Sequence, residues 1–285
     1  MRLAGSDRRM PGILHEPTSR RSFLRITCAG AAALVAGCQT RPAGTPSRFP
    51  VALLSDTHIP GDRVNGHRGF NPWENLRDAA AGIAQSGPEA VVISGDAARL
   101  VGTEADYQEL KALLQPVAAR APIYIGLGNH DDRANFRKVF APSTDLAGAT
   151  GDRHVLVVEH EVVRMIILDS LLEVNLTPGL LGKAQREWLD AYLGSHRDRP
   201  AVLFVHHTLE DRDGDLLDSD RLFAVLRRHR HAKALFYGHS HVWESRRRDG
   251  LHLVNLPAMG YNFDDRQPVG WVAASFHRRG VDLRL

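Results

Sequence analysis

The chain has 285 residues, of which 43% are hydrophobic and 24% are charged, an ordinary composition for one large globular domain or two small ones. This balance excludes a disordered chain, a collagen-like chain and a small disulfide scaffold, and the sequence has no run of about 18 apolar residues that could span a membrane. The net charge of +3 comes from the first 37 residues; without them the chain has 30 basic and 31 acidic residues, so no nucleic-acid partner is expected.

Residues 1–37 have the layout of an export signal. Two adjacent arginines, Arg20 and Arg21, precede Phe23 and a short apolar stretch rich in alanine over residues 26–36. The pattern S-R-R-x-F-L resembles the bacterial twin-arginine signal, which implies export through the twin-arginine translocon.

The segment after this leader has the composition of a tether. Small residues stand before Cys38, as in a lipobox, so we expect Cys38 to be acylated; ordinary cleavage at a small-residue site is the alternative. Residues 38–50 contain several prolines and small polar residues and would link an anchor to the domain. We therefore expect an exported lipoprotein, periplasmic or at the cell surface and attached to a membrane.

The first part of the domain alternates short apolar runs with segments of helical periodicity. Strands are expected at residues 51–55, 90–94 and 123–127, with helices at 73–86 and 104–119 between them. This β-α-β-α-β order implies parallel strands joined by right-handed crossovers.

The second part of the domain contains more strands and the same number of helices. The expected elements are a hairpin at 154–159 and 162–168, helices at 183–195 and 220–230, buried strands at 201–205 and 234–237, and short strands with turns at Asp249-Gly250 and Arg279-Gly280. No internal repeat or second linker interrupts residues 51–285, so one α/β domain with two packed sheets is expected.

Polar side chains follow the expected buried strands at the points where they end. Because ligand sites in open α/β sheets lie beyond the carboxyl ends of strands, five such ends can converge on one crevice. Carboxylate, carboxamide and imidazole groups suit borderline to hard divalent metals, and both cysteines lie in or at the end of the leader. Seven ligands are too many for one catalytic zinc and suit two metals about 3.5–4 Å apart that share a carboxylate. The candidates are Asp56, His58, Asp96, Asn129, His206, His239 and His241.

The spacing of Asp56 and His58 requires a change of backbone direction. Alternate residues of a strand point to opposite faces, so both can reach one metal only if the strand ends and the chain turns there. Glycines at 95, 128 and 238 suit such turns.

The ordered blocks D-x-H, G-D, G-N-H-D, H and G-H-x-H extend from Asp56 to His241 and resemble the calcineurin-like metallophosphoesterases. This resemblance implies an α/β fold with four layers, αββα, in which two mixed β-sheets are flanked by helices. It also implies the division of the ligands. One metal would be held by Asp56, His58 and His241, the other by Asn129, His206 and His239, and Asp96 would bridge them.

The same resemblance implies the catalytic residues. His130 would face the scissile phosphate as a general acid or charge stabiliser, with Asp131 orienting its ring. His206 is preferred to the adjacent His207 as the ligand, which leaves His207 as a candidate substrate contact.

The expected mechanism follows from two divalent cations. Their shared water would have a pKa of about 7, and the resulting hydroxide would attack phosphorus in line with the leaving oxygen. Asn129 and His130 would help to stabilise the phosphoryl charge. Manganese, iron and zinc all accept these ligands, so the sequence does not identify the metal.

A weaker resemblance concerns the substrate. Asp131-Asp132-Arg133, followed by Phe136 and Phe140, and residues 182–193 resemble the class III cyclic-nucleotide phosphodiesterases and the related glycerophosphodiesterases. Small phosphodiesters are therefore the expected substrates, with Arg133 as a candidate contact. The alternatives are a phosphomonoesterase or nucleotidase of the same fold and, more distantly, an inactive tethered binding protein, although no ligand has been lost. The sequence does not determine the oligomeric state.

Overall fold

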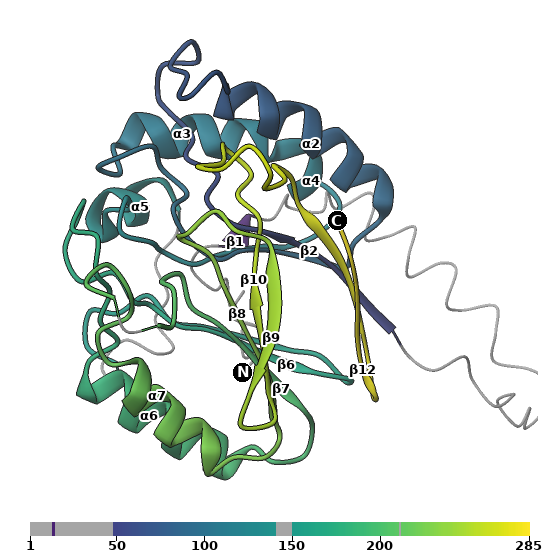
Figure 1. The fold of residues 1–285 in the computed structure, drawn as a ribbon. Helices are drawn as coiled ribbons and strands as arrows, with labels where there is room; N and C mark the ends of the chain where they lie inside the picture. Colours follow the sequence, from purple (N-terminus) through teal and green to yellow (C-terminus); the bar gives the residue numbers. More distant parts are fainter. Residues whose placement is uncertain (1–12, 15–47, 141–149, 211) are drawn as a thin grey trace, which may run out of the picture.

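The computed structural model describes residues 13–14, 48–140, 150–210 and 212–285, so the expected leader and tether lie almost entirely outside the described residues. Two six-stranded sheets pack face to face, with helices on both outer faces (Figure 1). The expected four-layer αββα sandwich is confirmed. None of the described helices is long and apolar enough to cross a membrane.

The first sheet is built around parallel strands β2, β3 and β4. β3 is buried throughout and β2 over most of its length, which explains their continuous apolar sequences. The sheet order is β1 (Ile13–Leu14), β4 (Ile123–Ile125), β3 (Ala90–Ile93), β2 (Arg48–Leu54), β11 (Val272–His277) and β12 (Gly280–Arg284).

Four helices cover the outer face of the first sheet (Figure 1). α2 (Pro72–Ser86) begins at Asn71, whose side chain accepts hydrogen bonds from the first turn, and ends at Gly87 in the left-handed conformation. The helix expected over 104–119 is divided into α3 (Glu104–Leu113) and α4 (Gln115–Ala118), because Pro116 has no N–H to continue the first helix.

The second sheet contains parallel strands β6, β7, β8 and β10, with antiparallel strands at both edges. Helices α6 (Lys183–Ser195) and α7 (Ser219–Arg227) pack on its outer face. The sheet order is β5 (Leu156–Glu159), β6 (Arg164–Ile167), β7 (Ala201–Phe204), β8 (Ala232–Tyr237), β10 (Leu251–Asn255) and β9 (Glu244–Arg248).

Two elements were not predicted, and both expected C-terminal hairpins are confirmed. The short helix α5 (Arg133–Val139) follows an Asp132 cap, and β1 pairs antiparallel with β4 at the sheet edge. β9 and β10 meet at Asp249 and Gly250, which both have positive φ, as a tight hairpin turn requires. β11 and β12 form the other hairpin.

Candidate metal centre

The seven predicted ligands lie at the carboxyl ends of five strands. Asp56 and His58 follow β2, Asp96 follows β3, and Asn129 follows β4. His206 follows β7 and the pair His239 and His241 follows β8, in the facing sheet. Because β2 to β4 are parallel to one another, as are β7 and β8, their ends bring these residues together at one end of the sandwich.

A left-handed backbone allows alternate residues to share a metal. Asp56, His58, Asp96, His239 and His241 have φ values of 51°, 47°, 49°, 70° and 56°. Non-glycine residues rarely adopt this conformation, and each costs about 1 kcal/mol or more. The left-handed turns bring Asp56 and His58, and likewise His239 and His241, into one centre. The structure therefore provides the change of direction that the D-x-H spacing requires.

The ligand atoms form two groups. In the first group, which consists of Asp56, His58 and His241, the ligand atoms lie within 4.8 Å of one another. The second group consists of Asp96, His206 and His239, and its ligand atoms also lie within 4.8 Å of one another. We call these the first and second ligand groups.

Asp96 lies between the two groups. Its Oδ2 is 3.3 Å from Nε2 of His206 and 3.7 Å from Nε2 of His58. Its Oδ1 accepts a hydrogen bond of 2.9 Å from the backbone N–H of His130, which fixes the carboxylate. This is the position that a bridging carboxylate needs.

Asn129 has a side-chain oxygen that is free to act as a ligand. Its side chain is buried, and its Oδ1 has no hydrogen-bond partner among the described residues. A buried carbonyl oxygen without a partner is costly, and a bound cation would satisfy it. The oxygen and nitrogen donors of the two groups and Asn129 therefore fit two divalent cations.

Burial and charge give the histidines different protonation states. Burial lowers the pKa of His58 to about 3 and that of His239 to about 4. Burial alone would also lower the pKa of His206, but the carboxylates of Asp96 and Asp56 outweigh it and raise this pKa to about 9. Both carboxylates have lowered pKa values despite their burial, because neighbouring histidines favour the charged form; His206 contributes to both shifts.

Backbone carbonyls orient the ligand rings. Nδ1 of His241 lies 2.6 Å from the carbonyl oxygen of Tyr261, and Nε2 of His239 lies 3.1 Å from that of Gly214. Nδ1 of His58 is 3.3 Å from the carbonyl oxygen of Arg99. Such contacts fix which ring nitrogen faces the metal.

The three predicted glycines have different roles. Gly95 has a φ of 136°, as expected for a turn that favours glycine. Gly128 and Gly238 are needed for space, because a Cβ atom would lie 2.2 Å from Oδ1 of Asp96 and 2.5 Å from Oδ2 of Asp56, respectively.

The expected role of Asp131 in orienting His130 is wrong. The carboxylate of Asp131 accepts hydrogen bonds from the backbone N–H groups of Ala97, Ala98 and Gly128 and from the hydroxyl of Tyr107. Nδ1 of His130 instead lies 2.9 Å from the carbonyl oxygen of Leu100.

Asp131 therefore ties two of the ligand-bearing loops together. Its bonds join the loop after β3 to the loop after β4, which carry Asp96 and Asn129. Burial and the nearby carboxylate of Asp96 raise the pKa of Asp131 to about 6.

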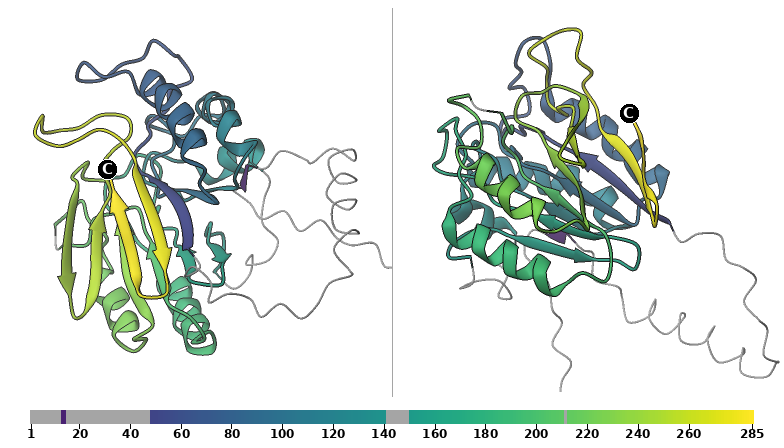
Figure 2. Two further views of the ribbon diagram at one scale, coloured as in Figure 1. Left: turned by 90° about the vertical axis from the view of Figure 1, so that its right-hand side faces the viewer. Right: turned by 60° about the horizontal axis from the view of Figure 1, so that its bottom comes forward.

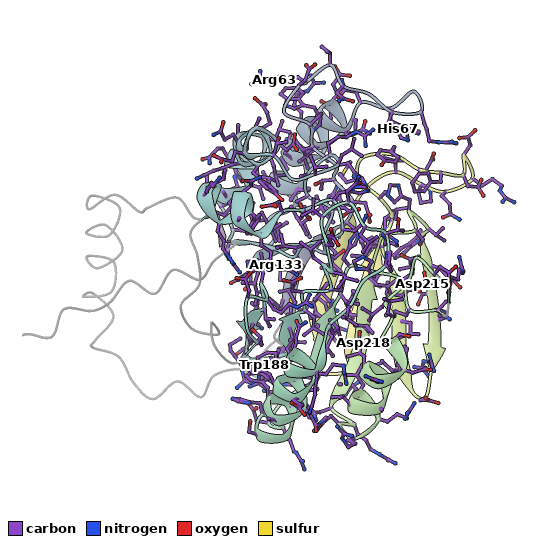
Figure 3. All side chains as sticks on the ribbon, turned by 90° about the vertical axis from the view of Figure 1, so that its left-hand side faces the viewer. Arg63, His67, Arg133, Trp188, Asp215 and Asp218 are labelled. Atoms are coloured by element: carbon purple, nitrogen blue, oxygen red, sulfur yellow. The ribbon has the colours of Figure 1, made fainter. Side chains whose placement is uncertain are left out.

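The candidate substrate contacts need correction as well. The guanidinium of Arg133 forms a two-pronged ion pair with buried Asp169, with bonds of 2.7 and 2.8 Å, so its expected role as a substrate contact is replaced by a structural one. Figure 3 shows Arg133 well apart from His67, which contacts Tyr261 beside the first ligand group.

The structure places His206, not His207, in the second ligand group. His207 is fully buried, and its Nδ1 lies 2.7 Å from the Ser170 hydroxyl. It contacts the rings of His206 and His239, and because it is fully buried the structure gives it a supporting position instead of a substrate contact.

Sequence reasoning missed three residues beside the first ligand group. The ring of Tyr261 stacks on His58 at 4.8 Å, and that of Phe263, which is 53% exposed, stacks on His241 at 4.4 Å. Arg99 lies over the Tyr261 ring, and its Nε is buried without a hydrogen-bond partner among the described residues. These residues lie outside the metal motifs, and only the position of Arg99 three residues after Asp96 was a signal.

Comparisons with known proteins identify the family of this chain. A probable cyclic nucleotide phosphodiesterase of Rhodococcus erythropolis is 32% identical over 84% of this chain and 79% of its own length. The glycerophosphodiester phosphodiesterase GpdQ of Enterobacter lignolyticus is 27% identical over 76% of this chain and 81% of its own length.

Among solved structures, a dimetal phosphatase from Danio rerio has a TM-score of 0.63 at 16% identity, covering 84% of this chain and 99% of its own. Purple acid phosphatase PPD1 from yellow lupin has a TM-score of 0.60 at 14% identity, covering 84% of this chain and 52% of its own. These similarities support the fold. Residues 49–243, more than half of the chain, match the calcineurin-like phosphoesterase family. The chain belongs to that family and is a metallophosphoesterase.

Proposed function

We propose that the protein hydrolyses small phosphodiesters with two divalent metal ions. The observation that carries this proposal is the position of Asp96 between two ligand groups, 3.3 Å from His206 and 3.7 Å from His58. The first group would hold one ion, and the second group, with Asn129, the other. When bound, such ions supply Lewis-acid stabilisation of phosphoryl charge and a water acidic enough to act as a nucleophile at neutral pH.

Among the described residues, His130 is placed to act on a phosphoester bound at the metal centre. A ring nitrogen of His130 lies within 4.8 Å of ligand atoms of both His58 and Asp96, but the ring is only partly buried. If Nδ1 donates its proton to the Leu100 carbonyl, Nε2 remains free to exchange a proton with a leaving oxygen. The backbone N–H of the same residue holds Asp96, so His130 couples the metal bridge to the reacting groups.

The diester preference is supported by relatives. Several related proteins are named as cyclic nucleotide phosphodiesterases, and another as a glycerophosphodiester phosphodiesterase. A diester has a second ester group, and the exposed ring of Phe263 and the partly buried side chain of Arg99 lie beside the first ligand group, where that second group could bind.

A substrate panel tests this function. Full-length protein loaded with Mn²⁺ should hydrolyse bis(p-nitrophenyl) phosphate and at least one of cyclic AMP and glycerophosphocholine faster than p-nitrophenyl phosphate, and chelation should abolish the activity. Hydrolysis of monoesters alone would overturn the diester assignment. Retention of full activity after exhaustive chelation would overturn the metal assignment.

We further propose that the protein is exported and anchored to a membrane through Cys38. The support comes from the sequence, because Arg20, Arg21 and Cys38 lie outside the described residues. Arg20→Lys with Arg21→Lys should trap precursor in the cytoplasm, and Cys38→Ala should release protein from membranes washed with 1 M salt. Normal export of the first variant would refute the twin-arginine route, and persistent attachment of the second would refute acylation.

A further inference from the structure

The core between the two sheets is open along one side of the sandwich. β9 and β12 are the edge strands on this side, and a cleft of about 810 Å³ runs between their hairpins. Figure 2 (left) shows the two hairpins side by side. The apolar floor continues the inter-sheet core and includes Val254, Phe276, Val281, Leu283 and Trp243. We call this the basal cleft.

Cations surround the basal cleft. Lys233, Arg247, Arg278 and Arg279 line it, whereas no aspartate or glutamate in the described part of the chain does. Among the described residues, none of these four side chains has a carboxylate within ion-pair distance. The cleft therefore combines an apolar floor with positive charge that has no internal counterion.

Strand β9 shows that this charge is directed into the cleft. Alternate residues of a strand point to opposite faces. Arg246 and Arg248 face the helix side of the sheet and pair with Glu210 and Asp220, each at 3.0 Å. Arg247, between them, lines the cleft without a carboxylate partner, and its guanidinium contacts Nε2 of His252 at 2.7 Å. The arginines on the outer face are thus neutralised, and the one facing the cleft is not.

The cationic part of the basal cleft lies at the end of the molecule where the chain enters the domain, and the cleft extends from there toward the metal centre as far as Trp243. Arg48, the first residue of β2, is paired in register with His277, next to the turn that carries Arg278 and Arg279. The metal centre follows the other end of β2, which is seven residues long, or about 20 Å away. Cys38 precedes Arg48 by ten residues, which reach at most about 35 Å.

We propose that the basal cleft docks on an anionic phospholipid membrane. The arginines and Lys233 would meet lipid phosphates, and the apolar floor would accept part of an acyl chain. This end would then face the membrane, and the metal centre would point away from it toward soluble substrates. The proposal goes beyond hydrolysis and does not require acylation, although an anchor at Cys38 would hold the same end of the domain at the membrane.

Vesicle sedimentation tests the charged part of this proposal. The protein used is the full chain carrying Cys38→Ser, which cannot be acylated at this position. Its sedimentation with phosphatidylcholine vesicles is compared with its sedimentation with vesicles that also contain 30% phosphatidylglycerol. Arg278→Glu with Arg279→Glu should weaken the binding that depends on phosphatidylglycerol by about tenfold or more. The matched control is Lys183→Glu with Arg266→Glu, because both residues are highly exposed and lie toward the opposite end; it should bind as the parent does.

Three outcomes of sedimentation would overturn the proposal: equal losses in the two double variants, no dependence on phosphatidylglycerol, or complete displacement by 10 mM inorganic phosphate at constant ionic strength. The last would indicate a site for free phosphate. Hydrolysis of bis(p-nitrophenyl) phosphate by each variant verifies its folding, and the milder pair Arg278→Gln with Arg279→Gln replaces the glutamates if folding fails. These outcomes do not depend on whether Cys38 is acylated in the cell.

A tryptophan introduced at Val281 tests the apolar part of the cleft. Val281 lines the floor and pairs with Phe276, beside the turn that carries Arg278 and Arg279. Phosphatidylglycerol with brominated acyl chains quenches only tryptophans close to it, so it should quench Val281→Trp more strongly than the parent protein, whose Trp243 lies two residues after the ligand His241. Equal quenching of Val281→Trp and the parent would place the membrane contact elsewhere and overturn the assignment.

Discussion

The two ligand groups are alike in geometry but differ in their protons and surroundings. Both combine one carboxylate with two imidazoles within 4.8 Å. In the first group burial keeps His58 neutral, and Tyr261 and Phe263 pack against its rings. In the second group the carboxylates raise the pKa of His206 to about 9. Similar coordination sets can therefore differ in how readily they bind a metal at neutral pH.

Asp96→Ala should have the largest effect, because it removes the side chain that faces both groups. We expect turnover to fall by about 10⁴-fold or more, since the stabilisation supplied by both ions is impaired. Metal content should fall as well, as measured by elemental analysis. Asp78→Ala is the matched control, because Asp78 is 70% exposed and should change neither quantity. Loss of only one group's metal in Asp96→Ala would argue against a bridge.

His130→Ala separates catalysis from metal binding. We expect both ions to remain and turnover to fall by about 10²–10⁴-fold, the usual contribution of a positioned acid–base group. If His130 protonates the leaving oxygen, the loss should be large for alkoxide leaving groups and small for nitrophenolate. Equal losses would assign it to charge stabilisation, and loss of metal would make it a ligand.

His58→Ala and His206→Ala address the two groups one at a time. Each variant should retain about one ion per chain and lose about 10²–10³-fold in turnover. Elemental analysis after dialysis against buffer that contains Mn²⁺ gives the metal content. If either variant kept two ions, the division of ligands between the groups would be incorrect.

The raised pKa of His206 predicts that metal uptake releases a proton. A metal binds neutral imidazole, so below about pH 9 His206 must lose a proton when the second group is filled, whereas His58, with a pKa of about 3, has none to lose. The affinity of the second ligand group for the metal ion should rise by up to about tenfold per pH unit from pH 6 toward pH 9. Calorimetry at pH 7.5 in buffers of different ionisation enthalpy should detect about one proton. Undetectable proton release would contradict this difference between the groups.

Phe263→Ala should have the smallest effect and tests the aromatic wall of the first group. A nucleotide base can stack on the exposed face of this ring, so KM for cyclic AMP should rise about 5–10-fold, with little change for glycerophosphocholine. Phe263→Tyr should retain the parent KM. An equal change for both substrates would exclude specific stacking.

The parts of the molecule that follow from local sequence were predictable. Buried strands have continuous apolar runs, and the ligands follow those runs, so the two sheets and the order of ligands could be anticipated. The left-handed backbone at Asp56 and His58 could only be stated as a requirement.

Partners distant in sequence could not be predicted. Arg133 pairs with Asp169, 36 residues away, and Asp131 bonds backbone N–H groups 33 and 34 residues away. Neither pairing leaves a periodic pattern. The adjacency of His130 and Asp131 was misleading, because the two side chains make different contacts: one with the Leu100 carbonyl and the other with buried N–H groups.

The metal content of active protein tests the central claim most directly. Full-length protein is loaded with Mn²⁺ and freed of loosely bound ions. Its metal content and its activity on bis(p-nitrophenyl) phosphate are then measured in the same sample. The two ligand groups that share Asp96 predict two ions per chain, with activity proportional to filling of the second site. Full activity with one ion per chain, or with none, would contradict a dinuclear centre.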